Sequence, residues 1–233
     1  MREIIFDTET TGLRHADGDR VIEIGAVELE NRFPTGRSFH VYINPDGRQV
    51  HPEALEVHGI EDAFLKDKPL FADIVQEFVD FIGDGHLIAH NASFDMGFIN
   101  AEFVLAKRAI FPAERVIDTL AIARRKHPMG PNSLDALCAR YNIDNAHRTK
   151  HGALLDAELL AEVYIELNGG RQAALMLETV PGASPLTAGL AQTESVRQFR
   201  PEPLPPRIAE EQLSRHREFV ETMGENAVWN RYN

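Results

Sequence analysis

The stretch REIIFDTETTGL, residues 2–13, runs from an apolar segment directly into two acids. Its apolar residues through Phe6 predict a buried strand. Asp7 and Glu9 follow two residues apart, and side chains at that spacing lie on one face of a strand. Two carboxylates held together repel each other unless a cation lies between them, so the pair indicates a divalent metal site. A strand that ends in a polar turn before Gly12 is the alternative that this stretch alone leaves open.

Composition indicates an ordinary globular protein. The chain has 233 residues, of which 43% are hydrophobic and 26% charged, enough for one well-buried domain with an appendage or for two small domains. No stretch approaches the roughly 20 apolar residues of a membrane span, and the N-terminus does not resemble a signal peptide. We therefore expect a cytoplasmic protein without membrane contact. The single cysteine, Cys138, rules out an internal disulfide framework and is expected to face the core from a helix.

The net charge of −12 limits the ways in which this chain could handle nucleic acid. Proteins that bind DNA strongly and nonspecifically do so through clustered Lys and Arg, so that class is excluded. An enzyme that holds a phosphodiester through metal ions bound to carboxylates remains compatible with this charge. Its affinity for the polymer would then come from a partner.

Hydrophobic periodicity predicts strands first and then an alternation of strands and helices. The expected strands cover 4–8, 21–29, 39–43 and 86–90, and the expected helices cover 71–82, 91–109, 116–126, 133–141, 153–168 and 208–223. This order predicts an α/β fold with a mixed sheet flanked by helices. Residues 180–206 are Pro-rich and predict an extended linker. We thus expect a catalytic domain over 1–170, a linker over 171–206 and a C-terminal segment over 207–233.

Two later motifs add acids to the opening pair. Asp95 in HNASFD follows a buried strand at the start of a helix, and Asp156 in HGALLDA lies in the first turns of another. His151 stands just ahead of that second helix. Open α/β folds place ligands at such strand ends, so the four acids and this histidine predict one site. Taken singly, each of these residues has a purely structural alternative, as an acid at the start of a helix or as an exposed loop histidine.

Two aromatic residues beside Asp95 are expected to be structural. Phe94 and Phe98 share helical spacing with Ile99 and Phe103, which indicates core packing.

The segments FDTETTG, HNASFD and HGALLDA resemble the three motifs of the DEDDh family of 3′→5′ exonucleases, most closely its proofreading members, over about residues 2–170. The resemblance implies an RNase H-like fold with a five-stranded mixed sheet. It implies that two divalent ions, Mg²⁺ or Mn²⁺, are held by Asp7, Glu9, Asp95 and Asp156. It also implies that His151 is the general base.

The resemblance further implies the substrate, a single-stranded or frayed DNA 3′ end from which nucleoside 5′-monophosphates are released. The residues expected to contact the terminal nucleotide are Asp7, Thr8, Glu9, Glu53, His58 and Asp156. For Glu53 and His58, an ordinary loop without contact to substrate is the alternative.

Proofreading members act with a polymerase, and the tail offers candidate attachments. The C-terminal segment, which contains Trp229, is expected to bind the alpha subunit of the polymerase. Gln172–Leu177 resembles a sliding-clamp-binding motif, although an incidental apolar patch would look similar. Two other functions stay open: an RNA-trimming relative with the same site, and a structural subunit that merely retains nuclease residues. The Pro-rich tail argues against an RNA-trimming enzyme, which has no need of a tether. The complete set of five site residues argues against an inactive structural subunit.

Overall fold

The computed structural model describes residues 1–146, 150–170 and 210–223. The chain divides into two units, Met1–Leu177 and Glu178–Asn233. The described part of the second unit contains one helix, α8 (Glu210–Thr222), where the sequence predicts a helix over 208–223. The predicted clamp-binding segment Gln172–Leu177, the predicted linker 171–206 and Trp229 lie outside the described residues, so those predictions stay predictions.

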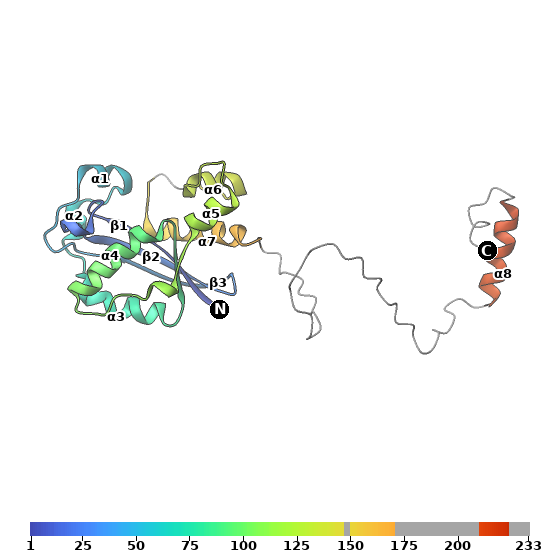
Figure 1. The fold of residues 1–233 in the computed structure, drawn as a ribbon, viewed down its shortest axis with the longest axis horizontal. Coiled ribbons are helices and arrows are strands. Elements are labelled where there is room, and N and C mark those ends of the chain that lie inside the picture. Colours follow the sequence, from blue (N-terminus) through green and yellow to red (C-terminus); the bar gives the residue numbers. More distant parts are fainter. Residues whose placement is uncertain (147–149, 171–209, 224–233) are drawn as a thin grey trace, which may run out of the picture. The chain divides into compact units, whose positions relative to one another are not determined.

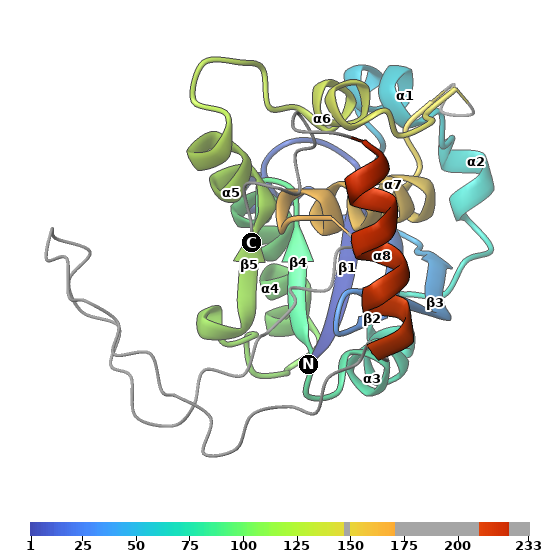
Figure 2. The ribbon, with the colours of Figure 1, turned by 90° about the vertical axis from the view of Figure 1, so that its right-hand side faces the viewer.

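A five-stranded sheet forms the centre of the first unit, as Figure 2 shows. Its strands are β1 (Arg2–Thr10), β2 (Val21–Glu30), β3 (Phe33–Tyr42), β4 (His86–Ala89) and β5 (Val116–Asp118). They lie in the order β3-β2-β1-β4-β5. The first three pair antiparallel, whereas β4 is parallel to β1 and to β5. The predicted mixed sheet is confirmed, with β1 at its centre.

Helices cover both faces of this sheet (Figure 1). They are α1 (Pro52–His58), α2 (Asp62–Leu65), α3 (Phe71–Ile82), α4 (Ala92–Leu105), α5 (Thr119–Lys126), α6 (Leu134–Tyr141) and α7 (Ala153–Leu167). Two short 3₁₀ helices are η1 (His15–Asp17) and η2 (Ala113–Arg115). The sequence predicts the bounds of α3 without error, because its apolar residues repeat at helical spacing up to a glycine.

Alternation along β1 gives each face its own core. Ile4 and Phe6 point toward α3 and α4, where they join the largest buried cluster. Ile5 points the other way and packs against α7 through Leu160. On that second face Tyr164 of α7 also donates a hydrogen bond of 2.8 Å to a carboxylate oxygen of Glu3. The central strand is therefore held from both sides, which fixes the acids at its far end.

Several elements differ from the sequence prediction. The segment Pro52–His58, for which a loop was an alternative, is helix α1, with proline in its first turn and Gly59 in the left-handed region as its C-cap. The predicted helix over 116–126 is wrong in its first turn, because Val116–Asp118 pairs with β4 as a strand. The Asp118 side chain then caps α5 by accepting a hydrogen bond from the Leu120 N–H.

Two further predictions concern single elements. Helix α4 ends at Leu105, earlier than the predicted boundary of 109. Cys138 is fully buried on α6, as predicted. The Ser133 hydroxyl caps that helix by accepting a hydrogen bond from the Ala136 N–H.

Candidate active site

The two acids of β1 lie at the end of the central strand, on the face that α7 covers. Asp7 and Glu9 follow Ile5 by two and four residues on the strand, so their side chains lie on the same face as that of Ile5, which packs against α7. Across the neighbouring strand Asp7 pairs with Gly25, and the register shifts just after Glu9. The strand thus presents both carboxylates on one face, as the sequence predicts, and this face is the one that packs against α7.

Helix α7 brings the third acid and the histidine to these two. Asp156 lies in its first turn with 2% of its surface exposed. His151 precedes the helix, and its Nδ1 lies 3.2 Å from Asp156 Oδ2 while its side chain remains 45% exposed. Glu9, His151 and Asp156 each offer a ligand atom, and these three atoms lie within 4.8 Å of one another. Residues far apart in sequence therefore converge at one point.

Asp95 approaches from the opposite side of β1, in the first turn of α4. The Thr8 hydroxyl donates to its Oδ1 over 2.7 Å, and only 3% of the residue is exposed. Burial raises the pKa of Asp95 to about 7, although hydrogen bonds from Thr8 and from the backbone act in the opposite direction. A buried carboxylate with this character is stabilised as an anion by a nearby cation.

A cavity of 280 Å³ unites all five residues of the predicted catalytic set. Its lining consists of Asp7, Thr8, Glu9, His90, Asn91, Phe94, Asp95, Ser133, Leu134, Asp135, His151 and Asp156. Asp7, Glu9, Asp95 and Asp156 offer carboxylate oxygens to this cavity, and such oxygens are the ligands that Mg²⁺ takes in proteins. The residues present therefore fit a divalent metal.

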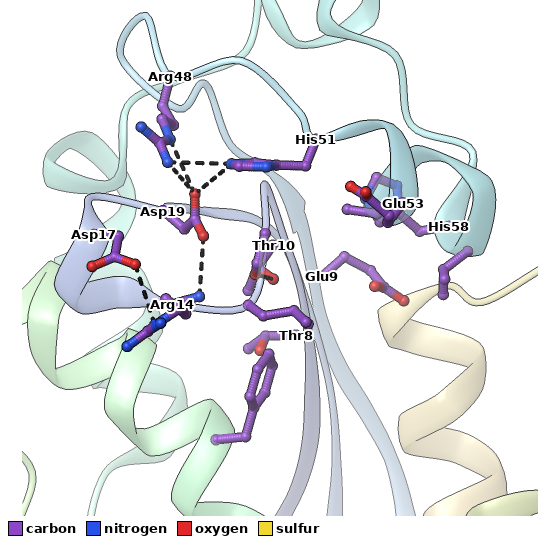
Figure 3. Close-up of a pocket in the computed structure, with 15 residues that line it drawn as sticks. Thr8, Glu9, Thr10, Arg14, Asp17, Asp19, Arg48, His51, Glu53 and His58 are labelled. Atoms are coloured by element: carbon purple, nitrogen blue, oxygen red, sulfur yellow. Dashed lines mark hydrogen bonds and ion pairs between the residues drawn. The ribbon is translucent and has the colours of Figure 1, made fainter.

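Figure 3 shows the residues of a second cavity, of 610 Å³. This cavity shares Thr8, Glu9 and Phe94 with the first. Its other lining residues are Thr10, Gly12, Leu13, Arg14, Asp17, Asp19, Arg48, His51, Glu53, Ala54, Val57 and His58. The predicted contacts Glu53 and His58 thus lie beside Glu9, carried by α1. The prediction that Phe94 is a core residue is wrong in part, because the ring is half-buried and lines both cavities. Phe98 is fully buried, as predicted.

The His58 ring is buried, and its hydrogen bonds define which of its nitrogens carries the proton. Its Nδ1 accepts a hydrogen bond of 3.0 Å from the Ile60 N–H, which places the proton of the neutral ring on Nε2. Burial lowers the pKa of His58, helped by the charges of Lys150 and His151, whereas the nearby Thr10 backbone raises it. Nε2 is buried and makes no hydrogen bond of normal geometry among the residues that the structure describes. His58 as a residue also lines the larger cavity.

The sequence does not predict a role for some residues that line the two cavities. Asp19, Arg48 and His51 line the larger cavity and are joined by hydrogen bonds. They come from two loops without any motif, and no periodicity marks them. His90 is held by Thr119 and by the Asn132 carbonyl at the smaller cavity. Its place in HNASFD, directly before the helix that carries Asp95, is the signal that could have found it.

Comparisons with known proteins agree with this geometry. The exonuclease family model matches residues 4–164. The DNA polymerase III subunit epsilon of Salmonella typhimurium is 47% identical, over 98% of this chain and 97% of that protein. The subunit of the same name from Escherichia coli is 55% identical, over 73% of this chain and 72% of that protein.

Solved structures show the same fold. Exonuclease X in complex with 5′ overhanging duplex DNA is 28% identical with a TM-score of 0.55, over 70% of this chain and 89% of that one. The nuclease domain of 3′hExo, a DEDDh family member bound to rAMP, is 18% identical with a TM-score of 0.62, over 72% of this chain and 92% of that one. This second likeness concerns the fold alone.

Fold, site and family match together define a 3′→5′ exonuclease with an RNase H-like domain. Within that class, the chain belongs to the family of DNA polymerase III epsilon subunits. Divalent metal ions are the cofactors of this class, in agreement with the donor set of Glu9, His151 and Asp156. None of the described helices is long and apolar enough to cross a membrane.

Proposed function

We propose that this chain is the proofreading exonuclease of a bacterial DNA polymerase III, which removes misincorporated nucleotides from the 3′ end of single-stranded or frayed DNA. The observation that carries the proposal is the convergence of Glu9, His151 and Asp156 within 4.8 Å in the smaller cavity, which shares Glu9 with the larger one. One cavity has the donors for metal, and the other has the size and the polar edges for a nucleotide.

Two divalent ions, Mg²⁺ or Mn²⁺, would be held by Asp7, Glu9, Asp95 and Asp156. When bound, such ions supply an acidified water and charge stabilisation for the leaving oxygen. The chain's own contribution is to hold these four acids against their repulsion. Thr8 fixes Asp95 by its hydrogen bond, and the close packing of α7 on the sheet fixes Asp156.

His151 is the proposed general base. Its exposed position ahead of α7 lets the imidazole reach a water at the smaller cavity, and histidine is the side chain that most often takes a proton in general base catalysis. The water oxygen forms a bond to phosphorus, the bond from phosphorus to the 3′-oxygen of the penultimate nucleotide breaks, and that oxygen takes up a proton. The products are a nucleoside 5′-monophosphate and a strand shorter by one nucleotide.

The larger cavity is the proposed pocket of the terminal nucleotide. Thr8 and Glu9 line both this cavity and the smaller one, and Glu53 and His58 of α1 line this cavity beside Glu9. The protonated Nε2 of His58 is the proposed hydrogen-bond donor to a sugar or phosphate oxygen of the substrate. Half-buried Phe94 offers a ring face beside a base.

Attachment to the polymerase belongs to the same proposal. The catalytic domain is assigned to 1–170, the linker to 171–206 and the segment that binds the polymerase III alpha subunit to 207–233. Gln172–Leu177 is the proposed contact with the sliding clamp. The net charge of −12 supports a partner that supplies most of the DNA affinity. A subunit that acts on the replicating chromosome would work in the bacterial cytoplasm, which is the proposed location.

The test is release of nucleotides from a DNA oligomer labelled so that the 3′-terminal nucleotide can be followed. The reaction is run with Mg²⁺, with Mn²⁺ and with EDTA, beside an RNA oligomer of the same sequence. Release of 5′-monophosphates from DNA in the presence of metal supports the proposal. Release only from RNA would favour an RNA-trimming enzyme, and release from neither would favour a structural subunit.

A further inference from the structure

A buried carboxylate lies in the larger cavity on the side away from Glu9 (Figure 3). Asp19, in the loop between β1 and β2, is 6% exposed and lines this cavity. It accepts hydrogen bonds from the Arg14 N–H over 3.0 Å, from Arg48 Nη2 over 2.7 Å and Nε over 3.0 Å, and from His51 Nε2 over 3.1 Å (Figure 3). No step of the proposed reaction uses Asp19.

These partners belong to two separate segments of chain. Arg14 lies in the same loop as Asp19, whereas Arg48 and His51 lie in the segment that leads into α1. A backbone bond of 2.8 Å from the His51 N–H to the Thr11 carbonyl joins the segments at a second point. The Asp19 carboxylate is therefore a side-chain cross-link between the two walls of the cavity.

The packing around this cross-link is tight. A Cβ added to Gly12 would lie 2.4 Å from Asp19 Oδ2 and 2.9 Å from His51 Cδ2. The loop that follows the β1 acids is thus pressed directly against the carboxylate and against the second wall. A small shift of either wall would change the shape of the cavity, because close-packed groups transmit displacement.

The cross-link lies directly at the start of helix α1. His51 is the residue before the helix, and its own side chain makes no capping bond to the helix N-terminus. The His51 ring instead donates a hydrogen bond to the Asp19 carboxylate. The helix that starts there carries Glu53 and His58 into the cavity, so the placement of these two side chains depends on the segment that Asp19 holds.

We propose that Asp19, through Arg48 and His51, is a positioning residue that fixes the α1 wall of the nucleotide pocket and thereby sets the affinity for the 3′-terminal nucleotide. This inference rests on the proposed function, in which that cavity holds the terminal nucleotide. Asp19 itself does not touch the reacting atoms, so its loss weakens substrate binding more than the chemical step.

The test compares Asp19→Asn, Arg48→Met and the double variant on a single-stranded DNA oligomer. Loss of a charge-assisted hydrogen bond predicts that KM rises about tenfold in Asp19→Asn, with kcat within about twofold of the unaltered protein. Thymidine 5′-monophosphate should inhibit more weakly by a similar factor. Because Arg48 acts through Asp19, the double variant should be no worse than Asp19→Asn alone.

Glu28→Gln is the matched control. Glu28 is also a buried carboxylate that pairs with two arginines, Arg2 and Arg37, but it lines neither cavity. This variant should lose comparable stability with KM unchanged. An equal rise of KM in Glu28→Gln would overturn the proposal in favour of general loosening of the domain. Unchanged KM in Asp19→Asn would also overturn it, as would additive effects of the two cavity variants, since Arg48 would then bind substrate directly.

Hydrogen exchange separates this inference from the proposed function. In Asp19→Asn, amides of 48–58 should exchange faster than in Glu28→Gln, whether or not the protein releases nucleotides. If the unaltered protein shows no nuclease activity but this exchange difference is present, the proposed function fails while the cross-link stands. If exchange over 48–58 is the same in both variants, the cross-link does not hold α1 and the inference fails.

Discussion

Gly25 of β2 lies directly beneath the backbone of Leu154 in the first turn of α7. A Cβ at Gly25 would lie 2.1 Å from the Leu154 nitrogen and 2.2 Å from the Ala153 carbonyl carbon, closer than any side chain can fit. Gly25 is also the residue that pairs with Asp7 across the sheet, and Asp156 follows Leu154 by two residues. The missing side chain therefore lets the helix bring its acid to the acids of β1.

Replacing Gly25 with alanine should separate these acids without removing any of them. The backbone of α7 must move away from the sheet, and a displacement of about 1 Å at a catalytic group lowers the rate about 100-fold. We expect Gly25→Ala to lower kcat by that order, as measured on single-stranded DNA. Gly130→Ala is the control, because its Cβ would meet only the guanidinium end of Arg140. Near-normal kcat in Gly25→Ala would show that the close approach does not position Asp156.

Removing an acid of the proposed metal site should abolish activity and leave the fold intact. We expect Asp7→Ala and Asp156→Ala each to lower kcat about 1,000-fold or more, since several kcal/mol of transition-state stabilisation is lost. The melting temperature should stay the same or rise, because repulsion between carboxylates is relieved. Asp17→Asn, which alters an exposed acid of the larger cavity, should keep its kcat. Near-normal cleavage by either alanine variant would refute the metal assignment.

Patterns local in sequence predicted most of the fold, and contacts between distant segments account for the rest. The alternation of β1 and the periodicity of α3 gave correct elements because each buries one face. The β5 strand was missed because three residues carry no periodicity of their own, and only pairing with β4 makes Val116–Asp118 a strand. Likewise the five predicted catalytic residues, which line one cavity, stand in motifs, whereas Asp19 was missed because its partners lie in another loop.

His58 should contribute to substrate binding through its Nε2 proton. Truncation in His58→Ala removes one hydrogen bond, worth about 1 kcal/mol, so KM should rise about fivefold with kcat little changed. His58→Gln can place an amide N–H near the position of Nε2 and should recover most of the affinity. Both variants are measured on single-stranded DNA at saturating metal. Failure of glutamine to recover KM would mean that the ring packs rather than donates.

Stability should fall in acid through Asp19. Burial alone would raise the pKa of Asp19, but the Arg14 N–H and the Arg48 and His51 side chains outweigh it and hold this pKa below the ordinary value of 3.8. A carboxyl whose pKa is lower in the folded state contributes stability above its unfolded pKa and loses it as the pH falls through the folded pKa. The melting temperature of Asp19→Asn should thus lie below that of the unaltered protein at neutral pH. This difference should shrink below about pH 3.8; a constant difference would contradict it.

Removal of residues 178–233 should separate cleavage from attachment. All residues of both cavities lie in the unit Met1–Leu177, so the truncated chain should cleave a free single strand at the unaltered rate. It should no longer co-purify with the polymerase alpha subunit, because the proposed binding segment 207–233 is gone. It keeps Gln172–Leu177, so binding to the sliding clamp should persist. Retention of the alpha subunit would place that interface on the catalytic domain, and loss of clamp binding would show that Gln172–Leu177 is insufficient by itself.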